Sequence, residues 1–326
     1  MNGLRLLTGI SGAALLSALL ASEARAQAEL PTIEVGAAAK RRAAKVAPAP
    51  KPQKVTVRPV APRPPPAPAP QSAVQQAEQK FNATQETASS KFTTGAEINA
   101  VPFSRTGEAL ETAVPGLLVT QHSGEGKANQ YQMRGFQLDH GTDFAVNLDG
   151  MPLNMPTHGH GQGYADANFL IPELFSYVVA HKGPYFAEEG DFSAAGAVHI
   201  QYKDEIPGGL FVATGGSFDY GRLLAIESTK VNGGNLLQAI ELGIYNGPWT
   251  VPDEVHRING VMRWTTGTPE NGLAIDAMAY ANRWHASNQI PERAVTEGVI
   301  SLYGNIEPAD RGDTTRFSLS TQWNET

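Results

Sequence analysis

Regular alternation of apolar and polar side chains in the C-terminal third constrains the fold more than any other feature of the sequence. Between Thr315 and Trp323 the odd positions are mostly apolar or aromatic and the even positions are polar. A period of two is typical of β-strands whose two faces meet different surroundings. It fits the wall of a β-barrel in lipid, and it equally fits a soluble β-sandwich with its apolar face inward. Periodicity alone does not separate these two folds.

The same alternation predicts about seven strands after residue 207. They fall near residues 208–218, 221–231, 235–246, 256–266, 271–284, 296–305 and 314–324. Trp264, Trp284 and Trp323 come near predicted strand ends, where a membrane barrel carries its aromatic girdles.

The N-terminus has the pattern of a secretory signal peptide. Arg5 precedes an apolar run over residues 6–21, and Ala24-Arg25-Ala26 is a small-residue cleavage pattern. The sequence therefore predicts export, with cleavage between Ala26 and Gln27. The chain has no cysteine, so disulfides do not hold it together.

A basic, proline-rich arm follows the predicted cleavage site. Residues 36–77 contain eight basic residues and no acidic one, and prolines are dense between Pro48 and Pro70. This composition predicts a disordered, extended linker over residues 37–77. Before it lies a short β-prone segment that could add a strand to the sheet edge of another protein: Leu30, Pro31, Thr32, Ile33, Glu34 and Val35. Nucleic acid is not expected as a partner of an exported chain.

The middle of the chain predicts a small α+β domain of short strands and helices. Ser104 is the expected N-cap of a helix that ends at Pro115-Gly116. Asp149-Gly150 predicts a tight hairpin. Four segments carry the order of motifs: "ALETAVPGLLV", "YQMRGF", "FAVNLDGMPLN" and "LIPELFSYVVAHKGPYFAEEGDFSAAGAVHI".

In order and spacing, these segments resemble the plug domain of TonB-dependent outer-membrane receptors. The resemblance implies a plug over residues 78–206 and an incomplete antiparallel transmembrane β-barrel over residues 207–326. It also implies a TonB box within residues 27–36, after the signal peptide of residues 1–26. A barrel of about 22 strands needs on the order of 400 residues, so the sequence is predicted to be an N-terminal fragment.

The implied function is active transport of a scarce ligand, such as a siderophore or metal chelate, across the outer membrane. The implied partners are the TonB energy transducer, outer-membrane lipid and a small-molecule ligand, with the box and linker in the periplasm. No cofactor is expected. The resemblance identifies Arg134 as a residue that locks plug to barrel, and the acidic residues Glu188, Glu189 and Asp191 are expected to take the same role.

Polar residues of two neighbouring loops are candidates for contact with the ligand: His140, Asp143, His158, His160, Gln162 and Tyr164. His158 and His160, two positions apart, could bind a transition metal, but spacing shows no third ligand and no metal site is assigned. One alternative is a non-transporting plug module that acts in the periplasm as decoy or signalling partner. A secreted β-rich enzyme or carbohydrate-binding protein is the other, and the sequence contains neither a catalytic constellation nor an aromatic platform, so no enzymatic activity is predicted.

Overall fold

The structure is a computed structural model that describes residues 72–83, 89–268 and 270–325. The predicted signal peptide, its cleavage site at Ala26 and Gln27, the box in residues 27–36 and most of the linker lie outside these residues. In the described part of the chain, no helix is both long and apolar enough to cross a bilayer.

The first described element is helix α2 (Ala73–Ala83), which begins inside the segment predicted to be a disordered linker. The predicted boundary at residue 78 therefore divides a helix. Ser72 and Gln75 form a reciprocal cap, in which each side chain bonds the other residue's backbone N–H. The proline-rich stretch ends at Pro70, and the residues that follow it are mostly good helix formers. Phe81 of α2 packs on Phe92, with ring centroids 5.9 Å apart.

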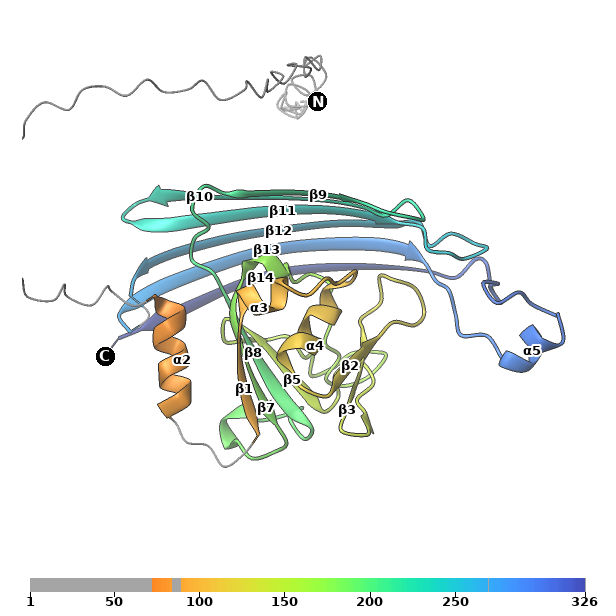
Figure 1. Ribbon diagram of the computed structural model, residues 1–326, viewed down its shortest axis with the longest axis horizontal. Helices are drawn as coiled ribbons and strands as arrows, with labels where there is room; N and C mark the ends of the chain where they lie inside the picture. The colour runs from red at the N-terminus through yellow and green to blue at the C-terminus, as the bar shows by residue number, and fades with distance from the viewer. Residues whose placement is uncertain (1–71, 84–88, 269, 326) are drawn as a thin grey trace, which may run out of the picture. The chain divides into compact units, whose positions relative to one another are not determined.

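Residues 89–206, called here the N-terminal body, contain two sheets (Figure 1). In the larger, the strand order is β1 (Ser90–Thr94), β7 (Phe175–Lys182), β8 (Gly196–Tyr202), β5 (Phe144–Leu148) and β6 (Met151–Pro152). Among the described strands of this sheet, only β5 and β8 are parallel neighbours. The smaller sheet joins β2 (Leu117–Thr120), β3 (Gln130–Met133) and β4 (Phe136–Gln137). The predicted α+β architecture of short elements is confirmed.

Short helices connect these strands. They are α3 (Gly95–Asn99), η1 (Thr106–Glu108), α4 (Ala109–Ala113), η2 (Pro172–Leu174) and η3 (Ala187–Glu189). Ser104 does not cap the predicted helix with its hydroxyl, which instead donates to Glu108 at 3.1 Å. The predicted hairpin at Asp149-Gly150 is confirmed: both residues have positive φ and the turn joins β5 to β6.

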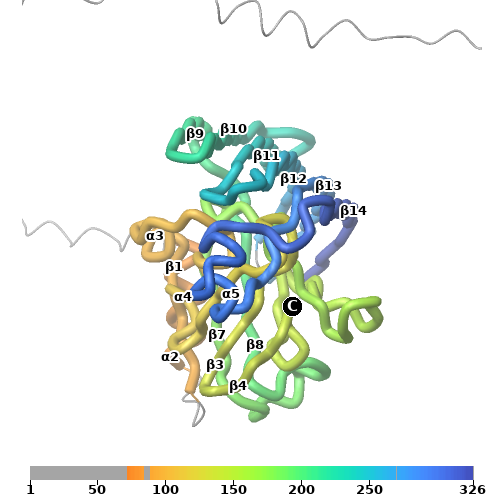
Figure 2. The backbone as a smooth tube through the Cα atoms, turned by 90° about the vertical axis from the view of Figure 1, so that its right-hand side faces the viewer, coloured from red at the N-terminus to blue at the C-terminus, as the bar shows by residue number. Residues whose placement is uncertain are grey.

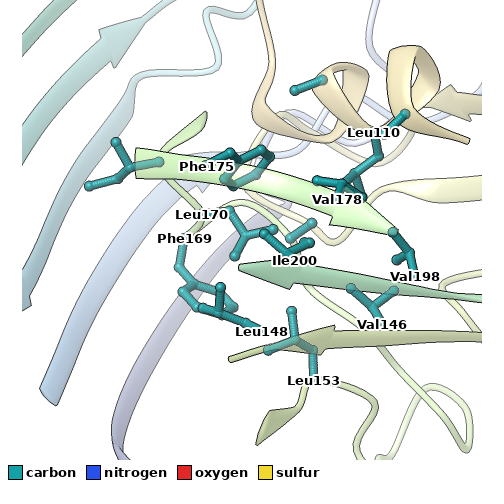
Figure 3. Packing of buried hydrophobic residues seen from close by; sticks show 14 of the residues in the cluster. Leu110, Val146, Leu148, Leu153, Phe169, Leu170, Phe175, Val178, Val198 and Ile200 are labelled. Carbon is teal, nitrogen blue, oxygen red and sulfur yellow. The ribbon is translucent and has the colours of Figure 1, made fainter. Parts of the chain in front are cut away.

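The core of the N-terminal body lies between the larger sheet and helices α3 and α4 (Figure 3). Leu110 of α4 meets Val178 of β7, and Val198 and Ile200 of β8 lie beside them; all four are buried. Phe169 and Leu170 come from the loop before η2 and belong to the same buried cluster, which also includes residues of the six-stranded sheet described next. Buried apolar area of this kind supplies the main driving force for folding.

Residues 210–324 form a six-stranded antiparallel meander, called here the large sheet. Its strands are β9 (Leu210–Gly215), β10 (Gly221–Val231), β11 (Gly234–Tyr245), β12 (Val255–Gly267), β13 (Gly272–His285) and β14 (Arg311–Asn324). The sheet is not closed: β9 and β14 are its edges in the described chain (Figure 2). From β10 to β14 each strand has 11 to 14 residues, enough to cross a bilayer.

The prediction of a strand at residues 296–305 is wrong. Helix α5 (Glu292–Thr296) and irregular backbone occupy this segment, which belongs to the long connection between β13 and β14. Gly298 has φ 70°, a conformation that favours glycine and interrupts an extended strand. The other predicted strands match β9 to β14 in order and position.

The two faces of the large sheet differ as the alternation predicts. Phe317, Leu319 and Trp323 are exposed by 80%, 76% and 72% on the outward face. The inward face carries Glu241, Asn259 and Arg263, which are buried against the N-terminal body. A soluble sandwich would bury the apolar face, so this arrangement excludes that alternative for β14.

The prediction that Trp284 belongs to an aromatic girdle is wrong, because its side chain lies on the inward face of the sheet. Its indole N–H donates to the carbonyl of Ser123 at 3.3 Å. A Cβ at Gly126 would lie 1.9 Å from the Trp284 ring, so the loop approaches the indole only because this residue is glycine.

Candidate functional site

A cluster of imidazole rings forms where three loops of the N-terminal body meet. His122 follows β2, Asp139 and His140 precede β5, and the loop of residues 153–166 supplies the rest. The histidine–tyrosine cluster is defined here as His122, Asp139, His140, His158, His160 and Tyr164. Ring centroids of His140 lie 5.1 Å from His122 and 4.6 Å from His160. The structure thus shows contacts between side chains of loops that the sequence predicted only to be neighbours.

His140 is the buried centre of this cluster, with 2% of its side chain exposed. Its Nδ1 lies 3.0 Å from the carbonyl oxygen of Asn129. A carbonyl only accepts, so Nδ1 carries the proton and the neutral ring presents a lone pair at Nε2. Among the described residues Nε2 has no hydrogen-bond partner, and burial lowers the His140 pKa to about 4. The ring is therefore neutral at pH 7 with a ligating nitrogen directed into the cluster.

The exposed side of the cluster comes from Asp139, His158 and His160. Asp139 places one carboxylate oxygen 3.6 Å from His140 Nε2 and the other 3.7 Å from His160 Nε2. His158 stacks on Tyr164 with centroids 3.9 Å apart and an interplanar angle of 12°. Burial raises the pKa of Tyr164 to about 12, so its hydroxyl stays protonated. The cluster offers nitrogen and oxygen donors at a surface that a small ligand can reach.

Asn154 holds the two loops together from below. Its amide nitrogen donates to the carbonyls of Gly141, Phe144 and Gly163, each at 2.9 Å, and its oxygen accepts from Val146 N at 2.8 Å. A side chain that satisfies so many backbone groups fixes loop geometry. No sequence motif indicates this role of Asn154.

Trp284 places the cluster near one end of the large sheet. It contacts the loop of residues 123–126, next to His122, and it precedes the connection of residues 286–310. The connections of residues 216–220 and 246–254 leave the sheet at this same end. The turns at residues 232–233 and 268–271, at the opposite end, are shorter.

The predicted ligand-contact residues divide into two groups. His140, His158, His160 and Tyr164 come together, whereas Gln162 is exposed and, within the part of the chain that the structure describes, Asp143 makes no hydrogen bond or ion pair with the cluster rings. The sequence missed His122 and Asp139, which with His140 place donor atoms within 4.8 Å of one another. His122 is 36 positions before His158, so no local spacing connects them. Two histidines and a carboxylate suit a divalent transition metal or its chelate.

The fold of residues 89–206 agrees with a comparison to known families. A family model described as the TonB-dependent Receptor Plug Domain matches residues 82–197. Residues 82–197 are a TonB-dependent receptor plug domain. No curated protein sequence matches the chain.

Solved structures of three receptors share the fold. Ferric citrate transporter FecA in its unliganded form is 14% identical, with TM-score 0.56, over 75% of this chain and 38% of that chain. Siderophore receptor PiuA from Acinetobacter baumannii is 14% identical, with TM-score 0.54, over 72% and 33%. The ferric yersiniabactin uptake receptor FyuA from Yersinia pestis is 16% identical, with TM-score 0.51, over 73% and 39%. The match thus spans a third to two fifths of these receptors.

Two arginines of the large sheet connect it to the plug domain. Arg263 of β12, 2% exposed, has Nη1 2.8 Å from Asp276 of β13 and 3.1 Å from Asp149 in the plug. Burial raises the pKa of Asp149 to about 7 although Arg263 opposes this shift. Arg222 of β10 binds Glu173 of the plug through two bonds, at 2.6 and 2.9 Å. Buried pairs of this kind are costly to break from one side only.

The residues predicted to lock plug to barrel are not the residues that form the ion pairs of Arg222 and Arg263. Arg134 occupies the two-residue turn between β3 and β4, with φ 54°, and is exposed. Glu188 and Asp191 are exposed, and Glu189 bonds His181 and His199 of the plug itself. Their role against a barrel wall stays a prediction, while Arg222 and Arg263 make the plug-to-sheet ion pairs described above. Arg263 lies on the polar face of β12, and the period-two alternation alone does not indicate its partner.

Proposed function

We propose that this chain is the N-terminal part of a TonB-dependent active transporter that carries a scarce metal chelate, such as a siderophore complex, across the outer membrane. The observation that carries this proposal is the histidine–tyrosine cluster on the plug, at the sheet end with the long connections. Barrels of this class have long extracellular loops and short periplasmic turns. The cluster therefore faces the outside in the proposed orientation, where ligand arrives.

Ligand capture would use the imidazole rings of the cluster and Tyr164. His140 is held in one tautomer by Asn129, so it requires little reorganisation to accept a metal or an electron-poor ligand group. His158 and His160 are exposed and can contact the organic part of a chelate. The role is binding and transport, and no catalytic step is assigned to these residues.

Energy would enter through the segment Leu30, Pro31, Thr32, Ile33, Glu34 and Val35. An extended segment can pair with the sheet edge of the TonB transducer. The basic linker lets this segment search the periplasm. Within the described residues a pull would then reach α2 and β1, and β1 is an edge strand bonded only to β7. An edge strand can leave without dividing the rest of the sheet.

Ile33→Pro tests the energised step. Proline removes the backbone donor and prevents strand pairing, so uptake should fall to the level of cells without the transducer. Radiolabelled iron chelates offered to energised cells give the measurement, and surface binding at 4 °C should stay unchanged. Ala61→Pro, in the proline-rich linker, is the matched control and should transport normally. Equal uptake by both variants would refute the proposed role of residues 30–35.

The combined His122→Gln, His158→Gln and His160→Gln variant tests ligand capture. Surface binding of the transported chelate should weaken by about 10-fold or more, since each lost contact to a charged group contributes roughly 1.5–3 kcal/mol. His256→Gln, on β12 away from the cluster, is the control. Unchanged binding and uptake in the triple variant would remove the cluster from the proposal. Recovery of the protein from the periplasm instead of the outer membrane would favour the decoy alternative.

A further inference from the structure

A second group of two histidines and one carboxylate lies on the plug sheet, and nothing in the proposed transport uses it. His181 belongs to β7, His199 to β8 and Glu189 to helix η3. In the β7–β8 register His199 faces Val179, so the two histidines are diagonal neighbours on one face of the sheet. Val178, Val198 and Ile200 point to the opposite face, into the core. Diagonal side chains are within reach of a shared partner.

Glu189 lies between the two imidazoles. Its Oε1 is 2.6 Å from His181 Nδ1 and its Oε2 is 2.7 Å from His199 Nε2. The donor atoms of all three residues lie within 4.8 Å of one another. Three ligands that each bind one ion at about 2.0–2.2 Å lie roughly 3–4 Å apart, so Glu189 and the two rings would need only a small outward movement to take an ion.

The surroundings hold this group in place. The side chain of Glu189 is 3% exposed and that of His181 is 13% exposed. Phe186 stacks on His181 with ring centroids 4.0 Å apart. Gly190, with φ 65°, ends η3, and its carbonyl accepts from Ser193 Oγ at 2.7 Å. His199 is 42% exposed, which leaves a route for an ion and room for water. Rigid ligands with one open side are typical of sites that bind a metal with three protein ligands.

Electrostatics favour a cation at this place. One ring nitrogen of each histidine shares a proton with the Glu189 carboxylate, so a bound ion would replace these two protons. A His₂Glu donor set suits Zn²⁺ and the neighbouring divalent ions better than Ca²⁺ or Mg²⁺, which prefer oxygen ligands.

We propose that His181, Glu189 and His199 bind a divalent transition ion, Zn²⁺ best, and that the ion fastens the loop of residues 183–195 to the plug sheet. The site is separate from the histidine–tyrosine cluster and does not depend on the proposed ligand. An ion that binds only the folded loop stabilises it by mass action. The loop contains the acidic residues Glu188 and Asp191, so the ion also sets how they are presented.

Cobalt spectroscopy on the full chain tests this site directly. The His122→Gln, His158→Gln and His160→Gln variant serves as the background, so that the other cluster contributes no exposed imidazole. In this background Co²⁺ alone should bind with one-to-one stoichiometry and visible d–d absorption, and Zn²⁺ should displace it. Saturating Zn²⁺ should raise Tm by roughly 5 °C.

Two variants and one control decide the result. Glu189→Gln and His199→Gln should each weaken Co²⁺ binding by at least about 10-fold and abolish the Zn²⁺-dependent rise in Tm. His256→Gln should leave both unchanged. His199 is half exposed, so His199→Gln decides the matter if Glu189→Gln fails to fold. Absence of saturable Co²⁺ binding in the background, or affinity within twofold in His199→Gln, would overturn the proposal.

Discussion

Replacement of Arg263 by methionine is expected to lower the free energy of unfolding by about 3–5 kcal/mol. The substitution keeps most of the side-chain volume but removes the charge that lies between Asp149 of the plug and Asp276 of β13. Both carboxylates are 1% exposed and would be left buried without a counter-charge. Urea titration of the protein in detergent micelles, followed by tryptophan fluorescence, measures the change.

The pH dependence of this variant has a definite sign. Burial already raises the pKa of Asp149 to about 7, well above its unfolded value of about 3.9. A carboxyl with a raised folded pKa favours the folded state at low pH and loses that contribution as pH rises through the folded pKa. Without Arg263 the Asp149 pKa rises further. The stability deficit of Arg263→Met should therefore be largest at pH 8 and shrink toward pH 5.

Two further variants make the Arg263 prediction specific. Arg283→Met removes an exposed arginine of β13 and should change stability by less than about 0.5 kcal/mol. Asp149→Asn combined with Asp276→Asn in the Arg263→Met chain should recover much of the loss, because no buried charge remains. A deficit equal to that of Arg283→Met, or one independent of pH, would contradict the described ion pairs.

Phe169→Ala is expected to cost about 3–5 kcal/mol, the second large effect. Phe169 is 1% exposed and belongs to the plug, yet its ring packs near Tyr280 of β13, with centroids 6.4 Å apart. The guanidinium of Arg316 on β14 lies 4.5 Å from the ring centroid. The backbone carbonyl of Phe169 also accepts a hydrogen bond from the side chain of Asn259 on β12. Truncation leaves a cavity at the junction of plug and sheet.

The matched control for Phe169 is Phe136→Ala. Phe136 is also a phenylalanine of the plug but is 62% exposed in β4, so its loss should change stability by less than about 0.5 kcal/mol. Thermal unfolding in the same detergent, with both variants side by side, gives the comparison. Similar Tm values for the two variants would show that Phe169 is not part of a packed junction.

Local signals predicted those elements whose cause is local. The Asp149-Gly150 hairpin follows from two residues that tolerate positive φ, and strands β10 to β14 follow from alternation. Helix α2 was missed although the Ser72-to-Gln75 spacing is that of a capping box. The strand predicted at residues 296–305 failed because Gly298 and α5 interrupt a segment whose apolar residues suggest a strand.

Long-range partners were the part that the sequence could not supply. His122 joins His140 across two strands, and Arg263 meets Asp149 across more than a hundred positions. Glu189 was assigned to an acidic lock, but its described partners are two histidines of its own sheet. Residue type indicates what each group can bind, and only the fold decides which group is near. Trp284 shows the same point, since its parity on β13 placed it inward, whereas proximity to a strand end suggested a girdle.

Lipid accessibility along β14 tests the central claim, that the plug is covered by a membrane barrel wall whose outward face meets lipid. The chain has no cysteine, so single cysteines at positions 315 to 320 can each carry one fluorophore. In bilayers with brominated lipid, labels at Thr315, Phe317 and Leu319 should be strongly quenched and labels at Arg316, Ser318 and Ser320 weakly. Equal quenching at odd and even positions, or quenching only at even ones, would contradict the account.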